Sequence, residues 1–439
     1  MKQKKFYLNH KIMKNKFKII LFLILTLNSN NLYAGTLTDS LNSAYLNNPK
    51  LNAERANVRA VKEERKGALS EFKPSITISG YVSEQDNTKG SESNYKPSER
   101  SLLIEQKIFQ GFGGIANLKK KDHEYSLAEF KLQKIEQEVL LDAVMAHADL
   151  LLSQKKVYIN RINIDLLERQ VETDRNRLEK GEINLTDLAQ SEASLAGAQA
   201  KLAAAQNDLV TSKANFEKII GKKVAENIQD VEFSNLWLPQ SLAEARNISG
   251  EENPDLKIAI LENEKAEQDV KIAKSDLIPS ATLSYKIAEQ EDFSSTIKER
   301  TQQTLKATAT WPLYSGGSNL SGLRKAKELK NKYDLLLQDS KKATNTAVAN
   351  AWSNYRSSKS VLDSTRSQVK AAEIANEGIT LEYESGGSNR STLEVIQSRS
   401  ILLDSRINLA ISERNFFVSK FNLLSAVGRL TGERLNLKQ

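Results

Sequence analysis

One stretch of the sequence constrains the fold more than any other: residues 115–180 contain neither proline nor glycine. Lys, Glu, Gln, Leu and Ala, which favour helix, are frequent there, and a Gly-rich run at 111–114 and Gly181 bound the stretch. We therefore predict a single helix of 66 residues. At 1.5 Å per residue, this helix would be about 99 Å long.

The apolar residues of this helix recur at alternating spacings of three and four, which predicts a coiled-coil seam. A second apolar stripe joins the seam near its middle, so the helix needs neighbours on two sides. Taken alone, the stretch fits a long dimeric coiled coil equally well. The seam consists of Ile115, Leu118, Tyr125, Leu132, Val139, Ala143, Ala146, Leu150, Val157, Ile164, Leu167, Val171 and Leu178. Its polar interruptions are Asp122, Glu129, Glu136, Asn160 and Asp174.

The first 34 residues have the features of an export signal. Seven lysines and no acidic residue accompany an apolar run at 19–27, and Leu32, Tyr33 and Ala34 resemble a signal-peptidase site. We assign 1–34 as a signal peptide, which is complete whether translation starts at Met1 or at Met13. Its removal lowers the basic residues from 63 to 56, against 55 acidic ones. The pI of 9.2 is therefore no evidence for a nucleic-acid partner.

Residue patterns typical of catalysis or of a bound cofactor are missing from the sequence. Cysteine is absent, which excludes disulfides, thiol chemistry and an N-terminal lipid on cysteine. His123 and His147 have no clustered acidic or Cys partners at metal-ligand spacing, so we interpret them as surface or packing residues. The sequence also lacks a nucleophile elbow, a P-loop and a dinucleotide fingerprint. We expect no enzyme, no metal and no cofactor.

The remainder of the chain contains one pattern twice. Asn48-Pro49 precedes Pro74, and 205 residues later Asn253-Pro254 precedes Pro279. Glycine breaks repeat at offsets of 204 to 207 residues, pairing Gly113 with Gly317, Gly181 with Gly386, and Gly221 with Gly428. This period far exceeds that of solenoid repeats and indicates internal duplication of a whole structural unit. We assign 35–242 to repeat 1 and 243–439 to repeat 2.

Each repeat is predicted to contain the same elements in the same order. In repeats 1 and 2 respectively, we expect a helix at 49–72 and 254–277, a strand pair at 75–110 and 280–314, and a long helical hairpin at 115–221 and 317–429. Polar loops at 85–98 and 289–299 join the strands of each pair. Residues 222–242 form a connecting segment, and the chain ends after the second hairpin.

The predicted strands alternate apolar and polar residues, so each face of a strand has one character. The most regular strand has Leu305, Ala307, Ala309, Trp311 and Leu313 on its apolar side. In the weaker strand at 102–109, Leu102, Ile104 and Ile108 are opposed by Glu105 and Lys107. The alternation alone fits a soluble sandwich or a membrane barrel.

Two observations favour the barrel. The chain carries an export signal, and the aromatic residues Phe109, Trp311 and Tyr314 lie at strand ends, as interface aromatics do in membrane proteins. Four strands cannot close a barrel. Two copies would give eight strands, whose interior side chains fill the bore, whereas three copies would give twelve and leave it open.

Several segments resemble the TolC-type outer-membrane efflux and secretion channels, over nearly the whole mature chain. They are WPLYSGG at 311–317, RLEKGEINLTDL at 177–188, YESGGSNRSTLEVI at 383–396 and the paired Asn-Pro helix starts. The resemblance implies an α+β membrane protein with long α-helical coiled-coil hairpins and four β-strands per chain. It also implies a homotrimer with a 12-stranded β-barrel in outer-membrane lipid, a 12-helix α-barrel in the periplasm, and a belt drawing on 224–242, with Phe233 and Trp237.

The resemblance further implies the exit duct of a tripartite efflux pump or type I secretion system. Its partners would be a periplasmic adaptor (membrane fusion protein) and an inner-membrane transporter, and its cargo drugs or secreted polypeptides. A gate near the helix turns would close the periplasmic end. Asp187, six residues after Gly181, matches the family's first-tip aspartate, and Tyr383 matches its tip tyrosine. Arg390 is the nearest counterpart of the tip arginine, although it lies four residues past Gly386, where two is usual.

Glu394 and Gln397 lie where the family has an inner acidic pair, so one of two carboxylate rings is missing here. Each assignment has an ordinary alternative. Asp187 and Glu394 also fit acids in the first turn of a helix, where the macrodipole favours them. Tyr383 also fits packing within a coiled-coil seam.

Two other classes of protein share some of these features. A periplasmic adaptor combines a helical hairpin with strands, but one hairpin per chain is expected there and this sequence predicts two. A coiled-coil surface stalk or adhesin has no need of a duplicated strand pair. The exit duct is therefore the leading interpretation.

Overall fold

The computed structural model describes residues 33–84, 96–225, 228, 236–294, 297–385 and 390–437. The first half of the chain contains β1 (Tyr33–Ala34), α2 (Leu37–Asn47), α3 (Pro49–Ser70), β2 (Ser75–Val82), β3 (Ser98–Gln110), α4 (Gly113–Glu179), α5 (Leu185–Ile220) and β4 (Lys223–Val224). The second half contains α6 (Leu242–Glu252), α7 (Pro254–Ser275), β5 (Ser280–Glu291), β6 (Glu299–Thr310), α8 (Ser318–Glu384) and α9 (Thr392–Ala426).

The chain divides into two compact units, and each takes segments from both halves of the sequence. The helical unit comprises Met1–Asn52, Glu136–Ile248 and Ala347–Gln439. The sheet unit comprises Ala53–Ile135 and Ser249–Thr346. Of the predicted features, residues 1–32, most of the first polar loop, Phe233 and Gly386 lie outside the described residues.

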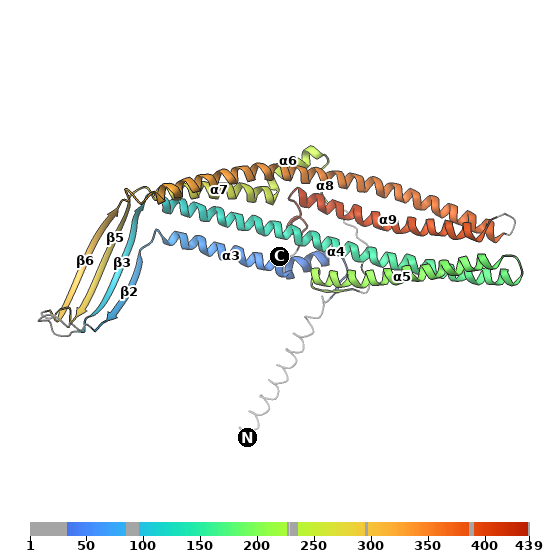
Figure 1. The fold of residues 1–439 in the computed structure, drawn as a ribbon, viewed down its shortest axis with the longest axis horizontal. Coiled ribbons are helices and arrows are strands. Elements are labelled where there is room, and N and C mark those ends of the chain that lie inside the picture. Colours follow the sequence, from blue (N-terminus) through green and yellow to red (C-terminus); the bar gives the residue numbers. More distant parts are fainter. Residues whose placement is uncertain are drawn as a thin grey trace, which may run out of the picture. The chain divides into compact units, whose positions relative to one another are not determined.

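The sheet unit contains one antiparallel sheet with the strand order β2-β3-β5-β6 (Figure 1). Its register aligns residues of one character across all four strands. Ile76, Ile104, Tyr285 and Leu305 form one such row, and Ser79, Ser101, Ala288 and Gln302 form a row of opposite orientation. Since neighbouring residues of a strand point to opposite faces, one face is largely apolar and the other largely polar.

The strands differ from the prediction at several positions. Ser98 belongs to β3 and Glu291 belongs to β5, although both lie in the predicted polar loops 85–98 and 289–299. Pairing with the neighbouring strand extends the strands into these segments. The strand β6 ends at Thr310, before Pro312, so Trp311 and Leu313 lie beyond it. A register shift between Lys107 and Phe109 places Phe109, and not Ile108, opposite Ala281.

Ion pairs join α4 to α3 and α7 within the sheet unit. Arg65 of α3 binds Asp122 at 2.5 Å, and Lys120 binds Asp269 of α7 at 2.8 Å. Asp122, an interruption of the predicted seam, therefore has an ionic partner. Asn253 caps α7 by accepting a hydrogen bond from the Leu256 amide at 3.1 Å, and α3 and α7 both end two residues before the predicted positions.

In the helical unit, α5 runs back along α4, and α9 runs back along α8 (Figure 1). The middle of the predicted seam is buried there, whereas Ile115, in the sheet unit, is exposed because it lines an open hollow beside Phe112. The buried seam residues are Val139, Ala143, Ala146, Leu150, Ile164, Leu167 and Val171. Every helix in the described ranges is too polar or too short to cross a lipid bilayer.

Two helices of 11 residues each, α2 and α6, were not anticipated from the sequence. A capping box between Thr36 and Asp39 starts α2. Ala245 of α6 is buried in a cluster with Val348, Leu423 and Val427. The strand β1, formed by the last two residues of the predicted signal peptide, pairs in parallel with β4.

Candidate functional site

A buried carboxylate lies near the hairpin turns of the helical unit. Asp174 of α4 has no exposed surface, and its oxygens accept three hydrogen bonds. Gln170 donates from Nε2 at 2.9 Å, Ser191 of α5 from Oγ at 2.5 Å, and Tyr383 of α8 from Oη at 3.1 Å. A buried carboxylate is tolerated when donors replace the water that it loses, so this position depends on all three partners.

Tyr383 connects this carboxylate to the fourth helix. Its side chain is 5% exposed, and its oxygen lies 3.0 Å from Oγ1 of Thr392, in the first turn of α9. The Arg177 guanidinium lies 4.5 Å from the centre of the Tyr383 ring, a cation–π geometry. Burial raises the pKa of the Tyr383 phenol, and the Asp174 carboxylate raises it further. The phenol therefore stays protonated and donates a hydrogen bond to Asp174.

Arg390 forms a second, more exposed group of contacts. Its Nε donates to Glu382 at 2.7 Å and its NH1 donates to Glu394 at 2.9 Å. Glu382 lies in the last turn of α8 and Glu394 in the first turn of α9, so Arg390 connects the two helices across a turn whose residues 386–389 lie outside the described ranges. The hydrogen bonds that Arg390 donates to Glu382 and Glu394 raise its pKa.

The two predicted tip acids, Asp187 and Glu394, both cap the helices that contain them. Asp187 and Asn184 exchange hydrogen bonds at 2.9 and 3.3 Å, and Glu394 and Ser391 exchange theirs at 3.3 and 2.8 Å. The hydrogen bond from the Ser391 amide lowers the pKa of Glu394 most, and the hydrogen bond from Arg390 lowers it further. Within one chain, both acids thus fit the ordinary alternative of first-turn acids. Gln397, one turn later on α9, is exposed.

The structure brings some of the predicted site residues together and separates others. Arg390 and Glu394 are in contact, whereas Tyr383 binds Asp174, a residue outside the predicted site, and Asp187 contacts Asn184. Asp174 appears in the sequence only as an interruption of the seam. Its position one heptad before Gly181 is the signal that marks it as a residue of the hairpin end.

The three aromatic residues predicted at a membrane interface lie at one end of the sheet. Phe109 is in register with Ala281, which pairs with Ala309 of β6, and its ring contacts Phe112 edge to face at 5.2 Å. Trp311 donates from Nε1 to the Leu277 carbonyl at 3.2 Å and is 60% exposed. Tyr314 is 88% exposed.

His123 and His147 have different surroundings. The buried His147 forms a hydrogen bond through Nδ1 with Oγ of Ser40 at 3.0 Å. His123 lies 3.2 Å from the carboxylate of Glu264. Among the residues that the structure describes, no three His, Asp or Glu side chains gather in a way that could hold a metal ion.

Comparison with known proteins supplies the family. The sequence model of the family described as "Outer membrane efflux protein" matches residues 40–222 and 247–429. The outer membrane efflux protein BepC of Brucella suis is 27% identical over 405 residues, covering 92% of this chain and 87% of the relative. The outer membrane protein TolC of Vibrio cholerae is 23% identical, with 92% of this chain and 93% of the relative covered.

The fold has solved counterparts as well. The crystal structure of the outer membrane protein VceC from Vibrio cholerae superimposes with a TM-score of 0.79 at 17% identity, covering 89% of this chain and 96% of that one. The resemblance to TolC-type channels is thereby confirmed. Because the family match spans both halves of the sequence, the chain belongs to the outer membrane efflux protein family and is an outer-membrane protein, one of a family of channels and not of enzymes.

Proposed function

We propose that three copies of this chain form the exit duct of a tripartite efflux pump or a type I secretion system. In this role the duct passes drugs or secreted polypeptides from an inner-membrane transporter and a periplasmic adaptor to the exterior. The sheet supplies one third of a 12-stranded barrel in outer-membrane lipid, and the hairpins supply one third of a 12-helix tunnel in the periplasm. Repeats 1 and 2, residues 35–242 and 243–439, each contribute two strands and one long hairpin.

The two edges of the sheet are the observation that carries this proposal. In the described chain, β2 and β6 are each hydrogen-bonded to one neighbour only, so each has a row of unpaired backbone groups. Lipid cannot satisfy such groups, and a membrane sheet must therefore close on itself. Pairing β6 of one copy with β2 of the next removes all edges, and three four-stranded sheets give twelve strands with an open bore.

The two faces of the sheet support the same arrangement. Ile76, Ile78 and Leu305 on the apolar face are between 67 and 81% exposed in one chain, which suits contact with lipid. The opposite face has Lys286 and Glu99 paired at 2.6 Å, which suits a water-filled lumen. Phe109, Trp311 and Tyr314 would then lie at the membrane interface.

Disulfide scanning between the edges tests the assembly, because the natural chain contains no cysteine. Cysteines are introduced in pairs, one at each successive β2 position from 75 to 82 and one at each β6 position from 299 to 310. We expect at least one register to give a covalent trimer on mild oxidation. The control pair Ser101→Cys and Ala288→Cys, which face each other on β3 and β5, should cross-link only within a chain. A scan that yields only monomers in every register contradicts the closed barrel.

The buried network at the hairpin ends supports a closed resting state. It connects α4 and α5 to α8 and α9 through Asp174, Ser191, Tyr383 and Thr392. Outside it, Arg390 joins α8 to α9 by binding both Glu382 and Glu394. In the proposal, docking of the adaptor and transporter separates the two hairpins. Purified protein in planar bilayers should show small single-channel conductance that increases when the network is broken. A chain that never conducts contradicts the duct.

A further inference from the structure

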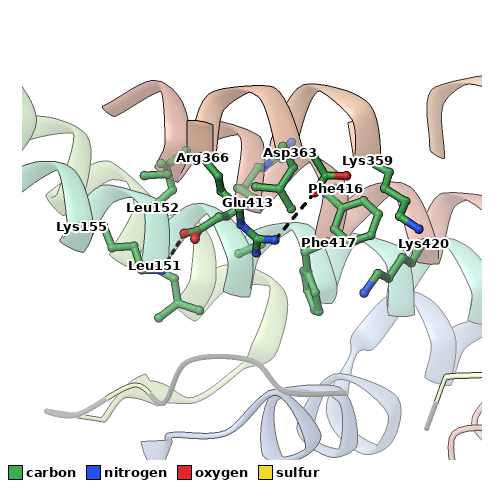
Figure 2. A pocket seen from close by; sticks show the side chains of 14 residues that line it. Leu151, Leu152, Lys155, Lys359, Asp363, Arg366, Glu413, Phe416, Phe417 and Lys420 are labelled. Atoms are coloured by element: carbon green, nitrogen blue, oxygen red, sulfur yellow. Dashed lines mark hydrogen bonds and ion pairs between the residues drawn. The ribbon is translucent and has the colours of Figure 1, made fainter. Parts of the chain in front are cut away.

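A cavity of about 440 Å³ lies in the helical unit, between α4, α8 and α9 (Figure 2). Its apolar wall is formed by side chains of all three helices, namely Leu151, Leu152, Leu362, Phe416 and Phe417. Its volume falls within the range of roughly 300 to 1,000 Å³ that small-molecule sites occupy. The cavity is separate from the Tyr383 network and shares no residue with it.

The charged residues around this cavity are mostly basic. Five basic and two acidic side chains line it. Three of the basic groups have carboxylate partners: Lys155 binds Glu413 at 3.1 Å, Arg414 binds Asp149 at 2.7 Å, and Arg366 lies 3.9 Å from Asp363.

The two other basic groups are Lys359 and Lys420. Among the described residues, no carboxylate lies within ion-pair distance of either. The Lys420 ammonium lies 4.5 Å from the centre of the Phe416 ring, and burial lowers its pKa, because its environment withdraws water without supplying a negative charge. Figure 2 shows Lys359 and Lys420 on the same side of the cavity, next to Phe416.

We propose that this cavity binds a small amphipathic anion, with its carboxylate or sulfonate held by Lys359 and Lys420 and its apolar body against the Leu and Phe side chains. An anion placed there supplies the charge that Lys420 lacks, and an apolar body replaces water against the leucines and phenylalanines. A neutral apolar compound would leave the desolvated Lys420 ammonium without a negative charge beside it. A cation would meet a surplus of positive charge. The site lies within one chain, so it does not depend on the proposed exit duct.

Photolabelling of the purified full-length protein in a non-ionic detergent tests this site. The probe is 4-benzoylbenzoate, a carboxylate with an apolar photoreactive body, and the matched control is the uncharged 4-benzoylbenzamide. After irradiation, mass spectrometry of the digested protein locates the attached probe. We expect saturable labelling by the carboxylate in the cavity segments 148–155, 359–366 and 410–420, and weaker labelling by the amide. Because labelling measures binding and not transport, its result is independent of whether the proposed exit duct is correct.

Variants distinguish specific binding in the cavity from non-specific binding of the probe. Lys359→Met with Lys420→Met should lower labelling by about tenfold, the loss expected when a bound anion loses its charge-assisted contacts. Lys370 is an exposed lysine of α8, the helix of Lys359, and lies outside the cavity. The Lys370→Met variant should therefore be labelled like the natural protein. Leu152→Trp, which fills the cavity and leaves both lysines in place, should also abolish labelling. Equal labelling by the acid and the amide, an unaffected double-lysine variant, or no labelling of the three segments would overturn the proposal.

Discussion

Tyr383 of α8 donates a hydrogen bond to Asp174 of α4 over 3.1 Å, although 209 positions separate the two residues in the sequence. Ser191 of α5 binds the same carboxylate, and Thr392 of α9 binds the same phenol oxygen. One small network therefore contacts all four helices of the two hairpins. Because its polar groups are buried, separating the hairpins requires water to enter and replace these bonds.

The first prediction concerns the Tyr383 hydroxyl. Tyr383→Phe should raise the open probability of single channels in planar bilayers, by about a hundredfold if the three chains open together. The physical reason is that Asp174 and Thr392 stay buried while each loses a partner. The cost is about 1 kcal/mol per chain, the low end for such a loss, because Asp174 keeps two other donors, and it is about 3 kcal/mol for three chains. Tyr158→Phe, an exposed tyrosine of α4, serves as the control and should leave the open probability unchanged. A Tyr383→Phe channel as closed as the natural one would contradict a role of the buried network in closing the channel.

The second prediction ranks the exposed contacts below the buried ones. Arg390→Ser removes the pairs with Glu382 and Glu394, which water and salt already weaken, so it should open the channel less than Tyr383→Phe does. High salt should reproduce most of the Arg390→Ser effect in the natural protein. The double variant should open more than either single variant, since each substitution removes contacts that the other leaves in place. A larger effect from Arg390→Ser than from Tyr383→Phe would reverse the ranking.

The third prediction concerns ion selectivity and its dependence on pH. Threefold repetition of Glu394 should give a ring of negative charge that favours cations, so Glu394→Gln should lower the cation preference measured from reversal potentials in a salt gradient. Hydrogen bonds from the Ser391 amide and from Arg390 lower the pKa of Glu394, so its charge persists below the ordinary glutamate pKa of about 4.3 and is lost only as the pH falls through the lower pKa of the folded protein. Glu394→Gln should be insensitive to that acid titration. Gln397→Glu should have the opposite effect to Glu394→Gln and increase cation preference.

The fourth prediction concerns processing of the amino terminus. We expect cleavage after Ala34, so that intact-mass analysis of protein extracted from the outer membrane finds Gly35 as the first residue. Cleavage would remove β1, the two-residue strand beside β4. Substituting Ala34 by a bulky residue should leave the precursor uncleaved. A mature chain that begins at Met1 or Met13 contradicts the assignment.

Features that depend on nearby residues can be read from the sequence alone. The 66-residue interval without Pro or Gly predicts α4 to within two residues at its start and one at its end. Asp187 and Glu394 lie three residues after Asn184 and Ser391, so their capping boxes depend only on local spacing. The alternation of apolar and polar residues in 75–82 and 304–310 likewise predicts strands from local spacing alone, since neighbouring side chains of a strand point to opposite faces.

Features that depend on how distant segments meet were decided by the tertiary structure. The sequence pairs Tyr383 with no particular acid, because the partner depends on the rotation and register of four long helices, and a small change in either turns another side chain inward. The same reason explains why Asp174, an irregularity in an apolar seam, is a buried acceptor of three hydrogen bonds. The shift at Ile108 and the cavity around Lys420 likewise arise only when strands and helices from both halves of the chain pack together.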